Sequence, residues 1–250
     1  MALVSGATRG IGRAIACALV AEGARVALTA RGEPELASMQ ATLAATAGPD
    51  RVRTFQADMT ESASVVGVAR SVTDAWGRVD IGVANVGSGT GRPLLEATPD
   101  DWWQGLQTNL LGAMELARAL VPGMQARGDG VLLFISSIAG VEATPAPLPY
   151  VAAKSALNAV AKSMARQLGA HGLRVNVLSP GNVLFPAGSW ARKLADAPDH
   201  VQAYIDAEVP MRRFGTPEEI ANVAVFMCSP RASFMTGASV VVDGGQTRVF

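Results

Sequence analysis

The stretch Ala2–Ala21, ALVSGATRGIGRAIACALVA, decides the fold of this chain. It opens with a short apolar run typical of a buried strand, and from Arg13 onward it has the amphipathic pattern of a helix. The turn between them, Ser5–Gly12, is rich in glycine. A strand, a glycine-rich turn and a helix form an anion site, because backbone N–H groups at the helix start point at a bound phosphate.

The glycines of this turn have separate expected roles. Gly6 would allow the tight turn, Gly10 would let a pyrophosphate approach the backbone, and Gly12 would let the helix pack closely on the strand. The spacing Gly-x-x-x-Gly-x-Gly differs from the Gly-x-Gly-x-x-Gly of the common dinucleotide fingerprint. A glycine-rich turn without a ligand is the alternative, and the strand–turn–helix context favours a dinucleotide cofactor over it.

The next expected strand, residues 25–30, indicates which dinucleotide is bound. NAD-binding folds place an Asp or Glu near the end of this strand to bind the ribose hydroxyls, whereas an Arg accommodates a 2′-phosphate. Here Arg31 follows the strand and Arg9 lies in the glycine turn. Guanidinium groups suit phosphate well, although both arginines could simply be solvated. We expect NADP(H), with NAD(H) possible.

Two later strands end in residues that suit a dinucleotide. Asp58 follows the strand at 52–55, where it could bond an adenine amine or, equally, cap the next helix. The strand at 79–84 leads into Asn85 and, after Val86, into Gly87. Small residues at that point would let the cofactor lie close to the backbone.

Strand and helix patterns alternate about seven times, which predicts an α/β fold with a doubly wound, parallel Rossmann-type sheet. We expect a single domain over residues 1–250 with strand order 3-2-1-4-5-6-7, flanked by helices. Crossovers should be right-handed, and the cofactor should lie where the strand order reverses. The long, apolar and irregular insertion at about 182–215 is expected to act as a lid or binding loop.

The stretch Ser136–Ser155, SSIAGVEATPAPLPYVAAKS, holds the candidate chemistry. Ser137 follows a buried strand, and ligands of parallel sheets bind at the carboxyl ends of strands. Tyr150 and Lys154 lie one turn apart on a single helix face. An ammonium beside a phenol lowers the phenol pKa from about 10, and such a phenol exchanges a proton with a carbonyl or alcohol oxygen. Alone, each residue also has an ordinary structural explanation.

The expected long helix Pro99–Arg127 carries further residues of interest. Asn109 lies in its apolar middle, where an Asn is neutral to unfavourable, so either it makes a specific bond or it is a tolerated polar residue. Trp102 and Trp103 near the helix start suggest packing or a subunit contact rather than chemistry.

Bulk composition excludes several classes of function. The chain has 250 residues, 17% charged side chains and a formal net charge of +0, which argues against nucleic-acid or membrane-surface binding. Cys17 and Cys228 are expected to be buried free thiols, in keeping with a cytoplasmic protein. His171 and His200 lack metal-ligand spacing, so no metal site is expected. The start of the chain lacks the pattern of a signal peptide, and the uncharged run 175–191 is broken by Pro and Gly, so no transmembrane helix is expected.

Taken together, the motifs resemble the short-chain dehydrogenase/reductase family over essentially the whole chain. They occur in the family's order: Ser5–Gly12, Asn85-Val86-Gly87, Asn109, Ser137, Tyr150 with Lys154, Pro180-Gly181 and Val242–Gly245. The steps from Ser137 to Tyr150 and from Tyr150 to Lys154 are the family's own spacing. Within the family, the chain looks most like 3-oxoacyl-[acyl carrier protein] reductases and related ketoreductases.

The resemblance implies a mechanism and a set of cofactor contacts. Tyr150 would exchange the proton on oxygen, Ser137 would orient the carbonyl, and Lys154 would lower the Tyr150 pKa and hold the nicotinamide ribose. Asn109 would place a water that links Lys154 to solvent. The implied cofactor-binding residues are Gly6, Thr8, Arg9, Gly10, Ile11, Gly12, Arg31, Asp58, Met59, Asn85, Gly87, Tyr150, Lys154, Pro180, Gly181 and Val183. A homotetramer or dimer is also implied.

Three positions depart from the family pattern: Ser5 replaces Thr, Val86 replaces Ala, and Phe185 stands where the family often has Thr. The last change removes one hydroxyl contact near the nicotinamide and could put an aromatic wall beside the substrate. With residues 143–148, Trp190 and Met211, the expected pocket is apolar, which favours an apolar, aromatic or acyl-type ketone.

Other functions on this fold are possible. An NAD(P)-binding sensor or scaffold could keep the glycine turn without turnover, but this chain retains Ser137, Tyr150 and Lys154. Enoyl reductases of a neighbouring branch resemble this chain but have a longer step from Tyr to Lys, and sugar epimerases usually have a separate substrate domain. A ketone/alcohol oxidoreductase fits these residues better.

Overall fold

The computed structural model describes residues 1–249; Phe250 lies outside the described residues. Over residues 1–249 one parallel sheet has the strand order β3-β2-β1-β4-β5-β6-β7, which confirms the expected topology. The strands are β1 (Ala2–Ser5), β2 (Val26–Ala30), β3 (Val52–Gln56), β4 (Ile81–Ala84), β5 (Gly130–Ile135), β6 (Leu173–Pro180) and β7 (Ser239–Val242).

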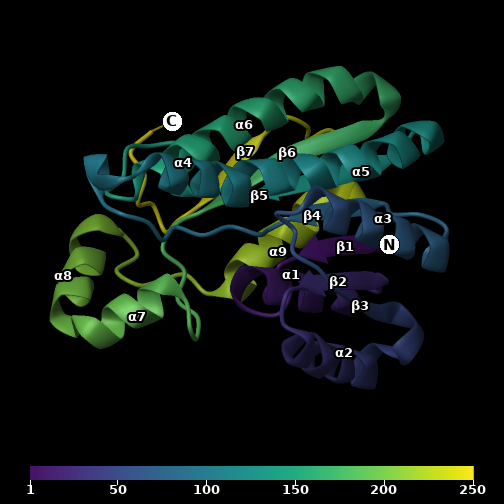
Figure 1. Ribbon diagram of the computed structural model, residues 1–250. Helices are drawn as coiled ribbons and strands as arrows, with labels where there is room; N and C mark the ends of the chain where they lie inside the picture. Colours follow the sequence, from purple (N-terminus) through teal and green to yellow (C-terminus); the bar gives the residue numbers. More distant parts are fainter. Residues whose placement is uncertain (250) are drawn as a thin grey trace.

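Helices cover both faces of the sheet (Figure 1). They are α1 (Gly10–Ala21), α2 (Glu33–Ala47), α3 (Ser62–Trp76), α4 (Pro99–Leu106), α5 (Gly112–Arg127), α6 (Leu148–Leu168), α7 (Ser189–Asp196), α8 (Pro198–Glu208) and α9 (Pro217–Cys228). One core cluster joins α1, α2 and α9 to the sheet, and the other joins α3, α5 and α6 to it. Central strands β1 and β5 are buried along their whole length, since both of their faces are covered.

The expected long helix Pro99–Arg127 is interrupted. Between α4 and α5 the chain makes a π-helical turn, Gln107–Leu111, in which the Gly112 N–H bonds the Gln107 carbonyl. α4 starts with a capping box at Thr98, and a second capping box starts α9 at Thr216, as its sequence predicts. π-turns of this kind often occur at functional sites, and this one contains Asn109.

The insertion at 182–215 is not irregular, so that expectation is wrong. It contains α7 and α8, which lie beyond the carboxyl ends of the strands, at left in Figure 1. Trp190 of α7 stacks on Tyr204 of α8 with ring centroids 5.4 Å apart, and its ring also lies 5.4 Å from that of Phe214. These aromatic contacts join residues distant in sequence, which is why local pattern did not reveal the helices.

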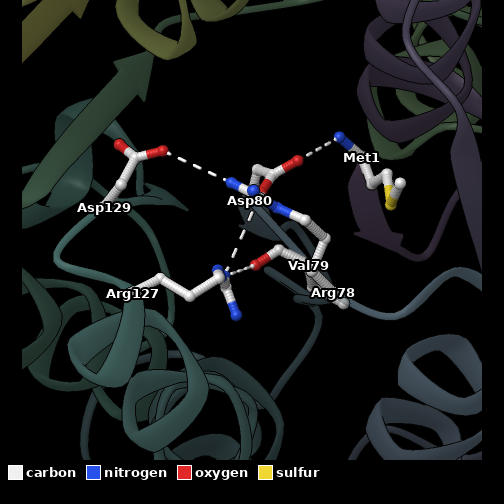
Figure 2. A network of polar contacts seen from close by, with 6 residues as sticks. All are labelled: Met1, Arg78, Val79, Asp80, Arg127 and Asp129. Carbon is white, nitrogen blue, oxygen red and sulfur yellow. Dashed lines mark hydrogen bonds and ion pairs between the residues drawn. The ribbon is translucent and has the colours of Figure 1, made fainter.

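A polar network lies at the amino ends of the central strands β1 and β4 (Figure 2). Asp80 pairs with the Met1 amine at 2.6 Å and with Arg78, and Arg127 at the end of α5 donates to the Val79 carbonyl. Burial alone would raise the Asp80 pKa, but hydrogen bonds from the Met1 amine and Arg78 outweigh it and lower the pKa below its ordinary value. The network ties β1, β4 and α5 together at the edge away from the strand ends that carry the candidate chemistry.

The thiols take no part in the polar networks. Cys17 is partly buried and Cys228 is buried, and both are free. Burial raises the pKa of the Cys228 thiol to about 12, so it stays protonated and behaves as a small apolar side chain. Among residues 1–249, none of the helices is long and apolar enough to cross a bilayer.

Candidate active site

The glycine turn is held in place by a side-chain link between β1 and β4. The Ser5 hydroxyl accepts a hydrogen bond from the Asn85 N–H at 2.9 Å, and the Asn85 amide donates to the carbonyls of Ser5 and Gly6. Gly6 has a φ of +63°, and a Cβ on Gly12 would lie 2.3 Å from the Gly6 oxygen. The expected turn at Gly6 and close approach at Gly12 are therefore confirmed, and Asn85 supports the turn itself.

The start of α1 offers an anion site. Arg9 precedes the helix in extended conformation, and within the described chain its side chain makes no capping bond and the first turn contains no acid. The first N–H groups of α1 are therefore available to donate hydrogen bonds to a ligand. Thr8 and Ile11 lie partly exposed beside them. These features fit a pyrophosphate, with one obstacle: a Cβ on Gly10 would lie 2.7 Å from Cε2 of Phe185, so that ring covers Gly10.

The opposite end of the expected cofactor site lies after β2 and β3. Arg31 is 79% exposed, and its guanidinium lies 4.0 Å from the Asp58 carboxylate. The other Asp58 oxygen accepts bonds from the Thr60 N–H and hydroxyl, which hold the Asp58 pKa below its ordinary value. The N-cap position of α3 is Glu61, and the Asp58 carboxylate bonds Thr60 ahead of the helix, so the helix-cap interpretation of Asp58 is wrong. Met59 is buried beside Asp58.

Ser137, Tyr150 and Lys154 come together where β5 ends and α6 begins. The Lys154 ammonium is buried, donates to the Ile135 carbonyl at 2.9 Å, and lies 5.8 Å from the centre of the Tyr150 ring. Two further bonds tie the segment around Ser137 to α6: Ser136 donates to the Lys154 carbonyl, and Asn158 donates to the Gly140 carbonyl. The strand end and the helix therefore present the hydroxyl, phenol and ammonium to one place.

Burial sets the protonation of this group. It raises the Tyr150 pKa above 10.0, while the Ser137 side chain lowers that pKa by a smaller amount. Burial also lowers the Lys154 pKa to about 8. The expectation that Lys154 lowers the Tyr150 pKa is wrong for this structure, because desolvation of the phenolate dominates and the ammonium is directed at the Ile135 carbonyl. At neutral pH the phenol is protonated and can act as an acid.

Asn109 makes specific bonds, as one interpretation of its sequence context predicts. Its amide donates to the carbonyls of Ser88 and Gly105, and its oxygen accepts from the Ser88 N–H at 2.9 Å. A Cβ on Gly87 would lie 2.9 Å from the Asn109 oxygen and 3.1 Å from the Lys154 nitrogen. Asn109 and Lys154 thus face the same narrow space, which only glycine at position 87 leaves open.

The end of β6 is held by the last motif of the chain. A Cβ on Gly181 would lie 2.6 Å from the Asp243 Cβ, so the turn after β6 packs directly against the turn after β7. Pro180 is buried at the end of β6, and the buried Val183 forms a bridge to Gly215. This packing explains why the Pro-Gly and Asp-Gly-Gly motifs occur together.

Sequence reasoning missed the role of the tail after β7. The Gln246 amide donates to the Tyr204 hydroxyl and accepts from Asn182, and Arg248 pairs with Glu208 at 3.1 Å. The Arg248 N–H also bonds the Glu142 carboxylate in the loop before α6. The tail therefore connects α8 to the loops that follow β5 and β6. These polar residues are ordinary in sequence, and no motif marks them.

We predict that Lys154 makes the free energy of unfolding rise with pH in the alkaline range. Its folded pKa of about 8 lies below its ordinary 10.5, so between these values the unfolded chain binds more protons and stability rises with pH. Relative to Lys154→Met, the wild type should gain on the order of 2 kcal/mol in unfolding free energy from pH 8 to pH 10. Urea unfolding of both proteins measures this difference. The contributions of the other titrating groups are common to both proteins and cancel in it. A constant difference across that range would contradict the prediction.

Comparison with known proteins identifies the group to which the chain belongs. Residues 6–247 match a family model described as enoyl-(acyl carrier protein) reductase. The 3-oxoacyl-[acyl-carrier-protein] reductase FabG of Salmonella typhimurium is 35% identical over 249 residues, which cover 100% of this chain and 98% of that protein. The D-threitol dehydrogenase of Mycolicibacterium smegmatis is 36% identical over 254 residues, covering 99% of this chain and 92% of that protein.

A solved structure is similar over the whole fold. The L-sorbose reductase of Gluconobacter frateurii, in complex with NADPH and L-sorbose, superposes with a TM-score of 0.94 at 33% identity, covering 100% of this chain and 97% of that one. The strand order of the sheet agrees with this structural similarity. The chain belongs to the short-chain dehydrogenase/reductase family, oxidoreductases that act between CH–OH and C=O groups.

Proposed function

We propose that this protein interconverts a ketone and a secondary alcohol with NADP(H), using Tyr150 as the general acid/base. The observation that carries the proposal is the convergence of the Tyr150 phenol, the Ser137 hydroxyl and the buried Lys154 ammonium at the carboxyl end of β5. The one-turn step from Tyr150 to Lys154 favours a carbonyl substrate over an enoyl one. NADP(H) is the favoured cofactor, in line with the NADPH complex of the sorbose reductase.

Each residue has a defined task. The cofactor, when bound, supplies or accepts the hydride. Ser137 donates a hydrogen bond to the carbonyl oxygen and stabilises the charge that develops there. Tyr150, protonated at neutral pH, gives its proton to that oxygen, and Lys154 and Asn109 provide a route by which the phenol regains a proton. A phenol that is protonated at neutral pH can act as the proton donor when the ketone is reduced.

The residues that would hold the cofactor follow the same edge of the sheet. The N–H groups at the start of α1 would bind the pyrophosphate, and Arg9 and Arg31 would bind the 2′-phosphate. Asp58 keeps one oxygen outside its bonds to Thr60, and this oxygen would accept from the adenine amine. Gly87 lets the backbone lie directly against Lys154, which would bind the nicotinamide ribose.

The proposed substrate is an apolar, aromatic or acyl-type ketone. Met211 of the expected pocket is 60% exposed, while the nearby charges of Glu208 and Arg248 pair with each other. Exposed apolar surface with paired charges favours a substrate without charges of its own. The named relatives act on both acyl and polyol substrates, so their names do not choose between these classes.

Tyr150→Phe tests the function. We expect it to lower ketone turnover by at least about 100-fold, since the proton donor is lost, while NADPH still binds. NADPH oxidation would be followed with acyl thioesters, aryl ketones, steroids, cyclic diketones and sugar acids. Tyr204→Phe is the matched control, because Tyr204 is the only other tyrosine, and it should stay within about tenfold of wild type.

Two results would contradict the proposal. Full turnover by Tyr150→Phe would show that Tyr150 is not the proton donor. NADPH binding with no turnover of any ketone, and none of the matching alcohols with NADP⁺, would instead favour the sensor or scaffold alternative. A strong preference for sugar acids would leave the reaction in place and overturn the apolar substrate class.

Arg31→Ala tests the cofactor preference. We expect NADPH to bind about tenfold more weakly while NADH is unaffected, because only NADPH carries the 2′-phosphate that a guanidinium would bind. Arg25→Ala is the matched control, since Arg25 is exposed at the opposite end of β2 and should change neither affinity. Titration calorimetry gives all of these affinities, and equal losses for NADPH and NADH would contradict the assignment.

We further propose a homotetramer. Large apolar side chains are exposed in two parts of the chain: Trp103 and Leu95 in and before α4, at 68% and 92%, and Phe226 and Phe234 in and after α9, at 43% and 105%. Exposed apolar side chains on different elements suit an assembly with two kinds of interface. Light scattering should give about four times the 25.8 kDa chain mass, and Trp103→Lys should halve it. A monomeric wild type would contradict this proposal.

A further inference from the structure

We propose that the Phe185 ring and the cofactor pyrophosphate use the same space above Gly10, so that Phe185 must move for NADP(H) to bind and thereby sets the cofactor affinity. This inference rests on the proposed NADP(H) site. It concerns a residue at which the chain departs from the family pattern, where a Thr is common and a Phe stands here.

The position of the ring is defined by contacts with two glycines. A Cβ on Gly10 would lie 2.7, 2.8 and 3.0 Å from Cε2, Cζ and Cδ2 of Phe185, so one edge of the ring faces the Gly10 Cα. A Cβ on Gly188 would lie 3.1 Å from the same Cε2 and Cζ atoms. Phe185 also packs against the core cluster that contains Val183, and so does Ile11 of α1.

The space that the ring fills is the approach to the anion site. α1 begins at Gly10, its first turn has no acid within the described chain, and Arg9 supplies no side-chain cap. Gly10 therefore gives a bound pyrophosphate its closest access to these N–H groups, provided that nothing covers the Gly10 Cα. An aromatic ring cannot occupy that surface together with a phosphate.

The backbone around Phe185 is built to let the ring leave. The segment is anchored on one side, where Leu184 donates to the Gly215 carbonyl at 3.0 Å and Gly215 donates to the Asn182 carbonyl at 2.9 Å. On the other side a tight turn bonds the Gly188 N–H to the Phe185 carbonyl, and Ala187 in that turn has a φ of +60°, which is unfavourable for a residue with a Cβ. Opening this turn relieves strain while the anchor holds.

Movement of Phe185 would also shift the helices α7 and α8. α7 starts at Ser189, directly after Gly188, and its Trp190 packs on Tyr204 of α8. In Figure 1 the segment between β6 and α7 passes near the start of α1, and the Gly10 contact shows that the two adjoin. Cofactor binding would therefore be linked to the position of α7 and α8.

Phe185→Ala tests the inference by binding alone. Titration calorimetry of wild type and variant would use NADPH and adenosine 2′-monophosphate, which has no pyrophosphate. Because the ring no longer competes, Phe185→Ala should bind NADPH at least fivefold more tightly, with adenosine 2′-monophosphate unchanged. Leu184→Ala is the matched control: it also shortens an apolar side chain but not one that covers Gly10, and it should change both affinities by less than about twofold.

A second variant keeps the test decisive if Phe185→Ala does not fold. Phe185→Leu retains an apolar side chain without the ring, and it should also tighten NADPH binding. Unchanged or weaker NADPH binding in a folded Phe185 variant would overturn the inference, and so would equal tightening for adenosine 2′-monophosphate or in Leu184→Ala. If NADPH bound to none of these proteins, the proposed cofactor site itself would fall as well.

Discussion

The buried ammonium of Lys154 constrains the rest of the site. A charge taken out of water needs a partner, and Lys154 finds it in the Ile135 carbonyl at the last residue of β5. That bond fixes how far α6 lies along the strand and so places Tyr150 beside Ser137. The cost of burying this charge appears as the lowered Lys154 pKa. The same burial raises the Tyr150 pKa, which keeps the phenol protonated. Position and protonation therefore have one physical cause.

The cofactor side of the sheet is organised by a different kind of bond. There, the Ser5 hydroxyl and the Asn85 amide link the ends of β1 and β4 without any charge, so the glycine turn keeps its shape whether or not an anion is present. Asn109 extends this link toward Lys154 through Ser88. Backbone-directed bonds thus hold both the glycine turn and the segment that faces Lys154, and most of them are made by side chains that the motifs of the family contain.

Much of this arrangement could be predicted from sequence, and the exceptions share a reason. The parallel sheet follows from buried apolar runs that alternate with helices, and the Tyr150–Lys154 step fixes its own geometry because it lies within one helix. The α7–α8 pair depends on Trp190 meeting Tyr204, and the Tyr150 pKa depends on how much protein surrounds it. Both depend on contacts between residues far apart in the sequence, which a local sequence pattern does not show. The place of Phe185 over Gly10 belongs to the same class.

The segment from Asn182 to Gly188 is where these parts of the protein meet. Its first residue accepts the Gly215 N–H and donates to Gln246 of the tail, its middle residue Phe185 covers the glycine turn, and its last residue, Gly188, directly precedes α7. A substitution here that reshapes the substrate pocket must therefore also change what the cofactor encounters. If Phe185 controls access to the cofactor site as proposed, affinity for cofactor and choice of substrate would be coupled through covalent continuity over a few residues, with no need for a signal carried through the sheet.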